Sequence, residues 1–96
     1  MPKTHTLKTW PRFFSAVWDR RKRFEIRRDD RDFAVGDHLY LHEYEHLAER
    51  YTGRLIVAEV LSVNSLRPLY DAVGMDIAVI DRRDVRDTLG EEAPHA

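Results

Sequence analysis

The stretch Arg23-Phe24-Glu25-Ile26-Arg27 decides how this 96-residue chain folds. Its side chains alternate, with the apolar pair on one side of the backbone and the three charged residues on the other, which is the two-residue period of a β-strand. It stands inside a dense run of charges over residues 19–33, and the turn signal Gly36-Asp37 follows soon after. The stretch therefore predicts a strand with one polar face.

Upstream of this strand, the pattern predicts a short strand and one helix. Residues 5–8 alternate weakly between polar and apolar side chains, as a first strand would. Aromatic and apolar residues then recur at helical spacing behind Pro11, a residue that is tolerated in the first turn of a helix. We expect a helix over residues 11–20, with its aromatic face laid on a sheet.

Downstream of Gly36-Asp37, alternation and β-branched residues predict further strands, over residues 38–44, 55–63 and 75–80. Residues 51–54 are expected to turn the chain between the first two of these strands. Residues 65–74, which end in Gly, are expected to hold a short helix. Residues 81–89 suit an exposed terminal helix or a frayed segment.

The order of these elements predicts a fold that is mainly β with α (α+β). Short strands joined by tight turns favour a small pseudo-barrel of about five to six strands with one helix packed across it. A doubly wound parallel sheet is disfavoured, because the chain has too few helices to cross between parallel strands. One domain is expected over residues 1–89, with residues 90–96 as a disordered tail.

The composition limits where and what the chain can bind. Its 16 Lys and Arg stand against 17 Asp and Glu, a formal net charge of -1, so any binding of anions must be local. Cysteine is absent, which excludes disulfides, thiolate metal sites and a Cys nucleophile. The longest apolar run, residues 55–58, is too short to cross a bilayer, and no signal peptide is evident. We expect a cytoplasmic protein that does not enter a membrane.

The six residues from Lys22 to Arg27 resemble the Lys-x-x-Glu-x-Arg signature of the ASCH superfamily, whose domains have a PUA-like fold. Further short blocks of the family pattern occur in the same order along the chain, one before the signature at residues 5–8 and three after it at residues 30–33, 35–37 and 51–54. With them, the sequence is similar to an uncharacterised ASCH-related family common in phages and bacteria. The resemblance implies a pseudo-barrel whose cleft, lined by the signature residues, accepts RNA or a modified base.

The charged residues of this signature form the candidate binding site. Lys22, Glu25 and Arg27 can share one wall of a cleft, with Glu25 holding the two cations so that they grip a phosphate or a base edge. The same residues could instead form an ion-pair strip on a solvated strand face, which would contribute little stability. The two alternatives differ in whether the side chains point into one concave surface.

Three further residues are expected to support this site: Lys8 near the start of the helix, Arg31 at the cleft rim, and Tyr44 as a ring on which a base can stack. His38 and His42 lie four positions apart, but on a strand that spacing separates side chains by about 13 Å. One metal ion cannot bridge such a distance. We therefore expect neither a metal nor a cofactor.

Three functions remain open at this point. The first is a module that binds RNA or a nucleotide in a charged cleft. The second is a small hydrolase, because some small ASCH proteins remove the acetyl group from N4-acetylcytidine with a Lys, a Thr and a distant Glu. Lys22 matches that Lys and would be the catalytic residue, but Glu25 stands where those enzymes carry Thr, which favours binding over catalysis. The third is a phage or bacterial protein that binds a host protein. The oligomeric state is open.

Overall fold

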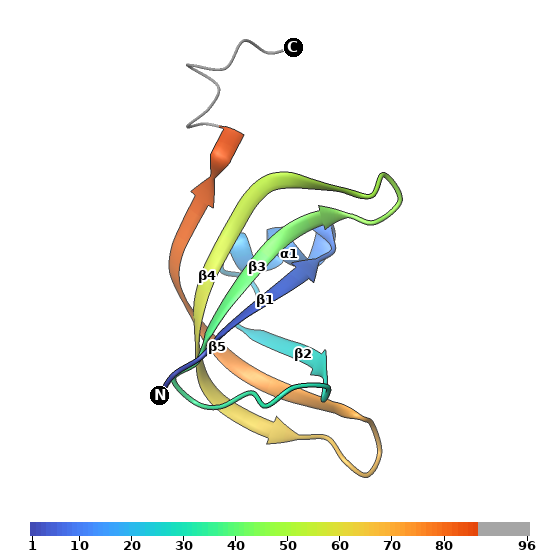
Figure 1. Ribbon diagram of the computed structural model, residues 1–96, viewed down its shortest axis with the longest axis vertical. Coiled ribbons are helices and arrows are strands. Elements are labelled where there is room, and N and C mark those ends of the chain that lie inside the picture. Colours follow the sequence, from blue (N-terminus) through green and yellow to red (C-terminus); the bar gives the residue numbers. More distant parts are fainter. Residues whose placement is uncertain (87–96) are drawn as a thin grey trace.

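The computed structural model describes residues 1–86, which contain five strands and one helix. In chain order (Figure 1) these are β1 (Thr4–Thr9), α1 (Pro11–Trp18), β2 (Phe24–Arg28), β3 (His38–Glu45), β4 (Arg50–Ser65) and β5 (Ala72–Asp84). The predicted class, mainly β with one helix, is confirmed. The predicted tail, residues 90–96, lies outside the described residues, as does the predicted domain end at residue 89.

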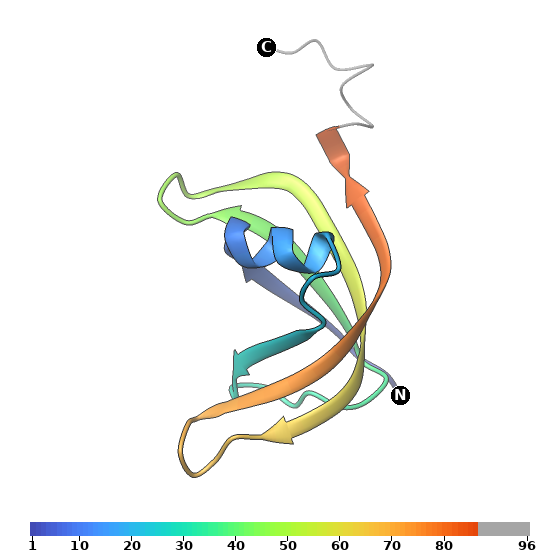
Figure 2. The same ribbon diagram turned by 180° about the vertical axis from the view of Figure 1, so that it is seen from behind.

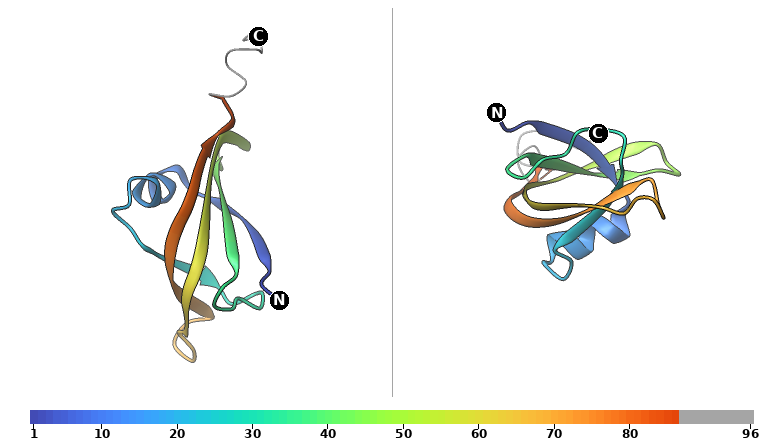
Figure 3. Two further views of the ribbon diagram at one scale, coloured as in Figure 1. Left: turned by 90° about the vertical axis from the view of Figure 1, so that its left-hand side faces the viewer. Right: turned by 90° about the horizontal axis from the view of Figure 1, so that it is seen from below.

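The strands form one sheet in the order β1-β3-β4-β5-β2. β1 runs parallel to β3, and every other pair of neighbours is antiparallel. The register between β4 and β5 shifts between Val57 and Ala58 and again between Val60 and Ser62. Such bulges bend and twist long strands. The sheet therefore curls into a half-barrel whose two edge strands are β1 and β2 (Figure 3).

Helix α1 packs across one face of this curled sheet (Figure 2). Its Phe14 and Val17 are fully buried, and its eight residues are too few for a helix that is stable alone, so packing must hold it in place. The helix ends two residues before the predicted end, and Arg20 takes a left-handed φ of 63°. No helix within residues 1–86 has the length and apolar character needed to span a bilayer.

The core lies between α1 and the concave face of the sheet. β1 alternates strictly, with His5, Leu7 and Thr9 facing inward. The buried apolar residues of the core come from every strand except β2, from α1 and from the loop before β3. They are Leu7, Phe14, Val17, Phe33, Leu39, Leu41, Ile56, Ala58, Val60, Val73, Met75 and Ile77. Full burial contributes about 1.5–3 kcal/mol for each of the larger apolar side chains.

β2 is the strand predicted from the alternating stretch, but its polar face points inward. Glu25 is only 3% exposed, whereas Phe24 and Ile26 are 47% and 56% exposed. An apolar face normally turns toward the core. Here the inward face carries a carboxylate together with its own cationic partners, Lys22 and Arg27, so that the buried charge is paired. The ion-pair strip is therefore not on a solvated face.

The hairpin between β3 and β4 corrects the prediction of a turn at residues 51–54. The chain turns earlier, at residues 46–49, where Glu49 has a φ of 52°. Tyr51 already pairs with Tyr44 across the two strands. Gly53, which suggested the turn, sits inside β4 with a φ of 101°, a conformation that glycine adopts without strain.

The predictions for the last third of the chain were wrong in two places. The expected short helix at residues 65–74 is replaced by a turn at residues 67–69 between β4 and β5. Pro68 explains this, because proline and the residue before it both disfavour helix. The strand predicted over residues 75–80 extends to Asp84, so residues 81–84 pair with β4 and are not helical; residues 87–89 lie outside the described part.

Candidate functional site

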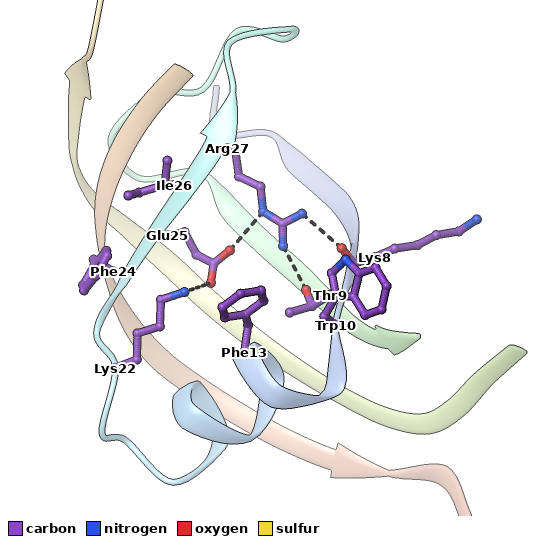
Figure 4. A pocket seen from close by; sticks show the side chains of 9 residues that line it. All are labelled: Lys8, Thr9, Trp10, Phe13, Lys22, Phe24, Glu25, Ile26 and Arg27. Atoms are coloured by element: carbon purple, nitrogen blue, oxygen red, sulfur yellow. Dashed lines mark hydrogen bonds and ion pairs between the residues drawn. The ribbon is translucent and has the colours of Figure 1, made fainter. Parts of the chain in front are cut away.

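A cleft with a volume of about 530 Å³ lies where the end of β1, the first turn of α1 and strand β2 meet (Figure 4). Nine residues line it: Lys8, Thr9, Trp10, Phe13, Lys22, Phe24, Glu25, Ile26 and Arg27. Sites for small molecules typically have volumes of about 300–1,000 Å³. The cleft is therefore large enough for a nucleobase or a similar ring system.

Glu25 lies at the buried end of this cleft and organises its charges. Its Oε2 accepts a hydrogen bond from Nε of Arg27 at 2.9 Å. Its Oε1 lies 3.8 Å from Nζ of Lys22, which is too long for a hydrogen bond, and no described residue donates to this oxygen. One carboxylate thus holds two cations, and one of its buried oxygens lacks the hydrogen bond that buried polar atoms normally have.

Arg27 is held on three sides. Besides its bond to Glu25, it donates to the carbonyl oxygen of Lys8 at 3.0 Å and to the hydroxyl of Thr9 at 2.9 Å. Its guanidinium therefore spans the space between β2 and β1 (Figure 4). With three of its donors bound inside the protein, Arg27 acts mainly to position Glu25 and the cleft wall.

Lys22 is the cation with free donors in the cleft. Its ammonium lies 5.0 Å from the centre of the Phe13 ring and 5.3 Å from that of Phe24. This ammonium donates no hydrogen bond to any residue in the part of the chain that the structure describes, whereas the backbone N–H of Lys22 donates to the carbonyl oxygen of Ala16. A cation between two rings is held by weak electrostatic attraction and keeps its N–H groups available. An acceptor on a ligand can therefore bind here.

The structure brings together Lys22, Glu25 and Arg27, as the motif predicts, and separates the three supporting residues. Lys8 contributes its carbonyl oxygen to the cleft, while its side chain runs away from Glu25 (Figure 4). Its ammonium lies 4.3 Å from the centre of the Tyr44 ring, on the outer face of the sheet. Tyr44 is not a lining residue of the cleft.

Arg31, like Tyr44, lies outside the cleft. It pairs with its neighbour Asp30 at 3.3 Å and lies over the Phe33 ring at 5.9 Å. Both members of the ion pair are exposed, and Arg31 does not line the cleft. The Asp-Arg-Asp segment therefore braces a surface turn instead of shaping the cleft rim.

Residues 4–73 match the protein family described as a domain of unknown function, DUF3850. The chain belongs to this family. It is also 36% identical over 66 residues to the "Uncharacterized 12.9 kDa protein in GpA 3'region" of Escherichia phage P2. That similarity covers 69% of this chain and 59% of the phage protein, so the chain spans less than two thirds of its relative's length. The predicted kinship with an uncharacterised family that includes phage proteins is confirmed.

All nine residues of the cleft fall inside the DUF3850 match, including several that the sequence reasoning missed. Thr9, Trp10 and Phe13 were not placed in the site, and Phe24 was assigned to an apolar strand face. The signal for Thr9 was present, because the alternation that buries His5 and Leu7 also turns Thr9 inward. For Phe13, nothing in the helical spacing separates an exposed ring from its buried neighbour Phe14.

A second buried ion pair lies beneath α1 in this DUF3850 domain. Arg54 donates two hydrogen bonds of 2.9 Å to the carboxylate of Glu43, and Thr52 donates a third. Burial alone would raise the pKa of Glu43, but the hydrogen bonds from Arg54 and Thr52 outweigh it, so the pKa lies below its ordinary value. The Arg54 guanidinium also lies 5.1 Å from Phe14 and 4.8 Å from Trp18. This pair anchors the helix that carries one wall of the cleft.

A third polar cluster fixes the start of β3. Asp37 is 2% exposed and accepts hydrogen bonds from the backbone N–H groups of Lys3 and Ala34. It also pairs with Nε2 of His5 at 2.7 Å. Burial alone would raise the pKa of Asp37, but these hydrogen bonds outweigh it and leave the pKa below its ordinary value. His5 does not line the cleft, so its role is packing and support of the strand.

Proposed function

We propose that this DUF3850 domain binds RNA or a nucleotide, with one base in the cleft. The observation that carries the proposal is the ammonium of Lys22, which lines the cleft, lies between two aromatic rings and donates no hydrogen bond to any residue described. Such a group is suited to the oxygen and nitrogen acceptors of a base or to a phosphate. Glu25 at 3.8 Å keeps the lysine positioned toward the cleft.

The walls of the cleft fit the flat faces of a base. Trp10, Phe13 and Phe24 line it, and each is between 42% and 47% exposed, so the rings are accessible to a ligand. Bases of single-stranded RNA commonly stack on such rings while their edges form hydrogen bonds with polar groups. Oε1 of Glu25, which accepts no hydrogen bond from any described residue, is an acceptor for a base amino group beside the Lys22 ammonium.

The resemblance of the Lys22, Glu25 and Arg27 motif to the ASCH superfamily belongs to the same proposal. ASCH domains have a PUA-like fold with a cleft suited to RNA or a modified base, which agrees with the position of the cleft found here. The curled half-barrel and its single helix fit that kinship. A cytoplasmic location is part of the proposal as well.

Calorimetric titration tests this function. Single-stranded RNA, structured RNA and nucleoside monophosphates are titrated at low salt, and we expect binding of at least one of the three. Lys22→Ala should weaken it about tenfold, because hydrogen bonds to charged groups contribute about 1.5–3 kcal/mol. Lys3→Ala, which removes a surface lysine paired with Asp32, is the matched control. If no nucleic acid or nucleotide binds at low salt, or if Lys22→Ala binds as the wild type does, the proposal is wrong and a protein partner becomes the leading alternative.

Hydrolysis of a modified nucleoside is the second candidate, and one observation favours it. Thr9 places a hydroxyl among the residues that line the cleft, together with Lys22 and a buried carboxylate. The sequence alone offered no hydroxyl near Lys22. Arg27 donates to the Thr9 oxygen, so the hydroxyl proton remains available for another acceptor.

Incubation with N4-acetylcytidine separates the two candidates. A hydrolase releases cytidine and acetate, which chromatography resolves from the substrate. Both Lys22→Ala and the isosteric Thr9→Val should then abolish product formation. Binding without product, with Thr9→Val still binding the nucleoside, leaves the binding module as the function.

A further inference from the structure

A row of aromatic rings leads from the cleft onto the outer face of the sheet. Trp10, which lines the cleft, stacks on His46 with ring centres 4.0 Å apart and planes 12° from parallel. The His46 ring lies 5.0 Å from Tyr44, and Tyr44 lies 4.8 Å from Tyr51. His42 continues the row 5.6 Å from Tyr51. Trp10 and His46 are stacked, whereas the other three contacts are edge-to-face with planes 66–90° apart, so the rings form a connected row that begins at the cleft.

A cation stands over this surface. The ammonium of Lys8 lies 4.3 Å from the centre of the Tyr44 ring and 5.9 Å from that of Tyr51. None of the ion pairs within residues 1–86 includes Lys8, so its charge is not neutralised by a carboxylate. The alternation of β1 explains its position, because an inward Thr9 forces Lys8 to the outer face.

Two rings of the row, Trp10 and Tyr51, are accessible to a partner, and Tyr44, His42 and His46 are partly exposed. Trp10 is 45% exposed and Tyr51 is 55% exposed, and α1 packs against the opposite face of the sheet. Burial lowers the pKa of His42, so its ring is neutral near pH 7 and can stack without carrying charge. A surface of rings with one unpaired lysine complements a chain of flat bases joined by phosphates.

We infer that this outer surface, formed by Trp10, His46, Tyr44, Tyr51 and Lys8, binds the nucleotides next to the one in the cleft. The ligand is then a single strand of two or more nucleotides, because the bases of a duplex are stacked on one another and cannot lie on protein rings. One phosphate of that strand contacts Lys8. The inference rests on the proposed function, since it assigns the continuation of a strand whose first base occupies the cleft.

Oligonucleotide length tests the inference. A ribonucleoside monophosphate and the corresponding di- and tetranucleotides are titrated by calorimetry, with deoxyribonucleotides of the same sequence to separate RNA from DNA. We expect the tetranucleotide to bind at least tenfold more tightly than the monophosphate, because a single base–aromatic stack alone changes affinity by about this much. Equal affinity for all lengths overturns the inference.

Two variants locate the added affinity. Tyr51→Ala should weaken the tetranucleotide about tenfold and leave the monophosphate unchanged. Lys8→Ala should reduce the slope of log K against log salt by about 0.7, the value for one phosphate contact on a single strand. The controls are Tyr70→Ala, which removes an exposed tyrosine (67% against 55% for Tyr51) between β4 and β5, and Lys3→Ala; both should bind as the wild type does.

The outcomes separate this inference from the proposed function. If the monophosphate binds and depends on Lys22, but Tyr51→Ala and Lys8→Ala leave the tetranucleotide unaffected, the cleft stands and the outer surface is not part of the site. If the tetranucleotide depends on Tyr51 and Lys8 but not on Lys22, the outer surface binds the strand without the cleft, and the assignment of the first base to the cleft is wrong. If nothing binds, both are wrong.

Discussion

The guanidinium of Arg27 donates a hydrogen bond of 2.9 Å to the hydroxyl of Thr9, and this bond joins β2 to β1, the strands at the two edges of the sheet. A second bond, to the carbonyl oxygen of Lys8, strengthens the link. Within residues 1–86 no backbone ladder connects these strands, so the Arg27 side chain closes the open side of the half-barrel. The same bonds form the wall of the cleft, so the closure of the fold and the shape of the candidate site depend on one residue.

Arg27→Ala should lower the free energy of unfolding by about 1.5–3 kcal/mol, because the buried Glu25 carboxylate loses its hydrogen bond from the guanidinium and keeps only the Lys22 ammonium, 3.8 Å away. Arg27→Lys should recover only part of this loss, since a lysine lacks the planar fork that reaches Glu25 and Thr9 together. Urea unfolding followed by circular dichroism measures both values.

Arg31→Ala is the control for this series. Arg31 is exposed, its ion pair is with an exposed neighbour and its contact with the Phe33 ring is long, so its loss should change stability by no more than about 0.5 kcal/mol. The double variant Arg27→Ala, Glu25→Gln should be less destabilised than the sum of its single variants, because the two side chains are in direct contact. An Arg27→Ala protein as stable as Arg31→Ala would show that the closure is dispensable.

The outward orientation of Phe24 and Ile26 makes a prediction with a matched control. Ile26 is 56% exposed and Ile77 is 4% exposed, and both lie in strands. Ile26→Thr should change the free energy of unfolding by no more than about 0.5 kcal/mol. Ile77→Thr should cost about 2–4 kcal/mol, because it removes buried apolar atoms and introduces a buried hydroxyl. Equal losses for the two variants would mean that β2 turns its apolar side to the core.

The sequence predicted the strands well where the alternation is regular, and it failed where tertiary contacts decide the orientation. The two-residue period of residues 23–27 is visible without a structure, but the period does not say which face is inside. Hydrophobicity favours Phe24 and Ile26 inside. The buried Glu25 is stabilised by its neighbours and by closure onto β1, and this closure is a contact between segments 18 residues apart.

The candidate site was half predictable for a related reason. Lys22, Glu25 and Arg27 form a contiguous motif, so one resemblance located all three. The remaining wall comes from the junction of β1 and α1, where Trp10 and Phe13 approach the motif only because the chain folds back. Lys8 and Thr9 are adjacent in sequence, so their side chains point to opposite faces of β1. The side chain of Lys8, which was predicted in the site, therefore lies on the outer surface, and the hydroxyl of Thr9, which was not predicted, lies in the cleft.

Gly53 and Gly74 form another matched pair. Gly53 has a φ of 101°, and an added Cβ there would lie 3.1 Å from Cγ of Arg86, whereas an added Cβ at Gly74 meets nothing within 4 Å. Gly53→Ala should destabilise the domain by about 1–3 kcal/mol, the usual cost of a strained backbone conformation. Gly74→Ala should be neutral or stabilising by up to about 1 kcal/mol. Thermal unfolding of both variants measures the two effects. A Gly53→Ala protein as stable as the wild type would show that this position does not need the left-handed conformation.

Stability should fall with decreasing pH in two steps, and His42 causes the first. Burial lowers its pKa below the ordinary value of 6.5, so the unfolded chain binds this proton more readily than the folded one. The contribution of neutral His42 to the free energy of unfolding is therefore fully present above about pH 7 and is lost as the pH falls through 6.5. Asp37 and Glu43 cause the second step, because their folded pKa values lie below the ordinary 3.8 and 4.5. Their contribution is present above about pH 5 and is lost as the pH falls further.

Urea unfolding midpoints between pH 8 and pH 3 measure both steps, and substitutions assign them. His42→Gln keeps a neutral polar side chain and should remove the first step while the second remains. Glu43→Gln should reduce the second step, because a neutral side chain no longer gains from Arg54 as the carboxylate does, and it should also lower stability at pH 7, since Arg54 would be left buried with an uncompensated charge. A domain that becomes more stable between pH 7.5 and pH 6 would show that the fold favours protonated His42, which is the opposite of what its burial predicts.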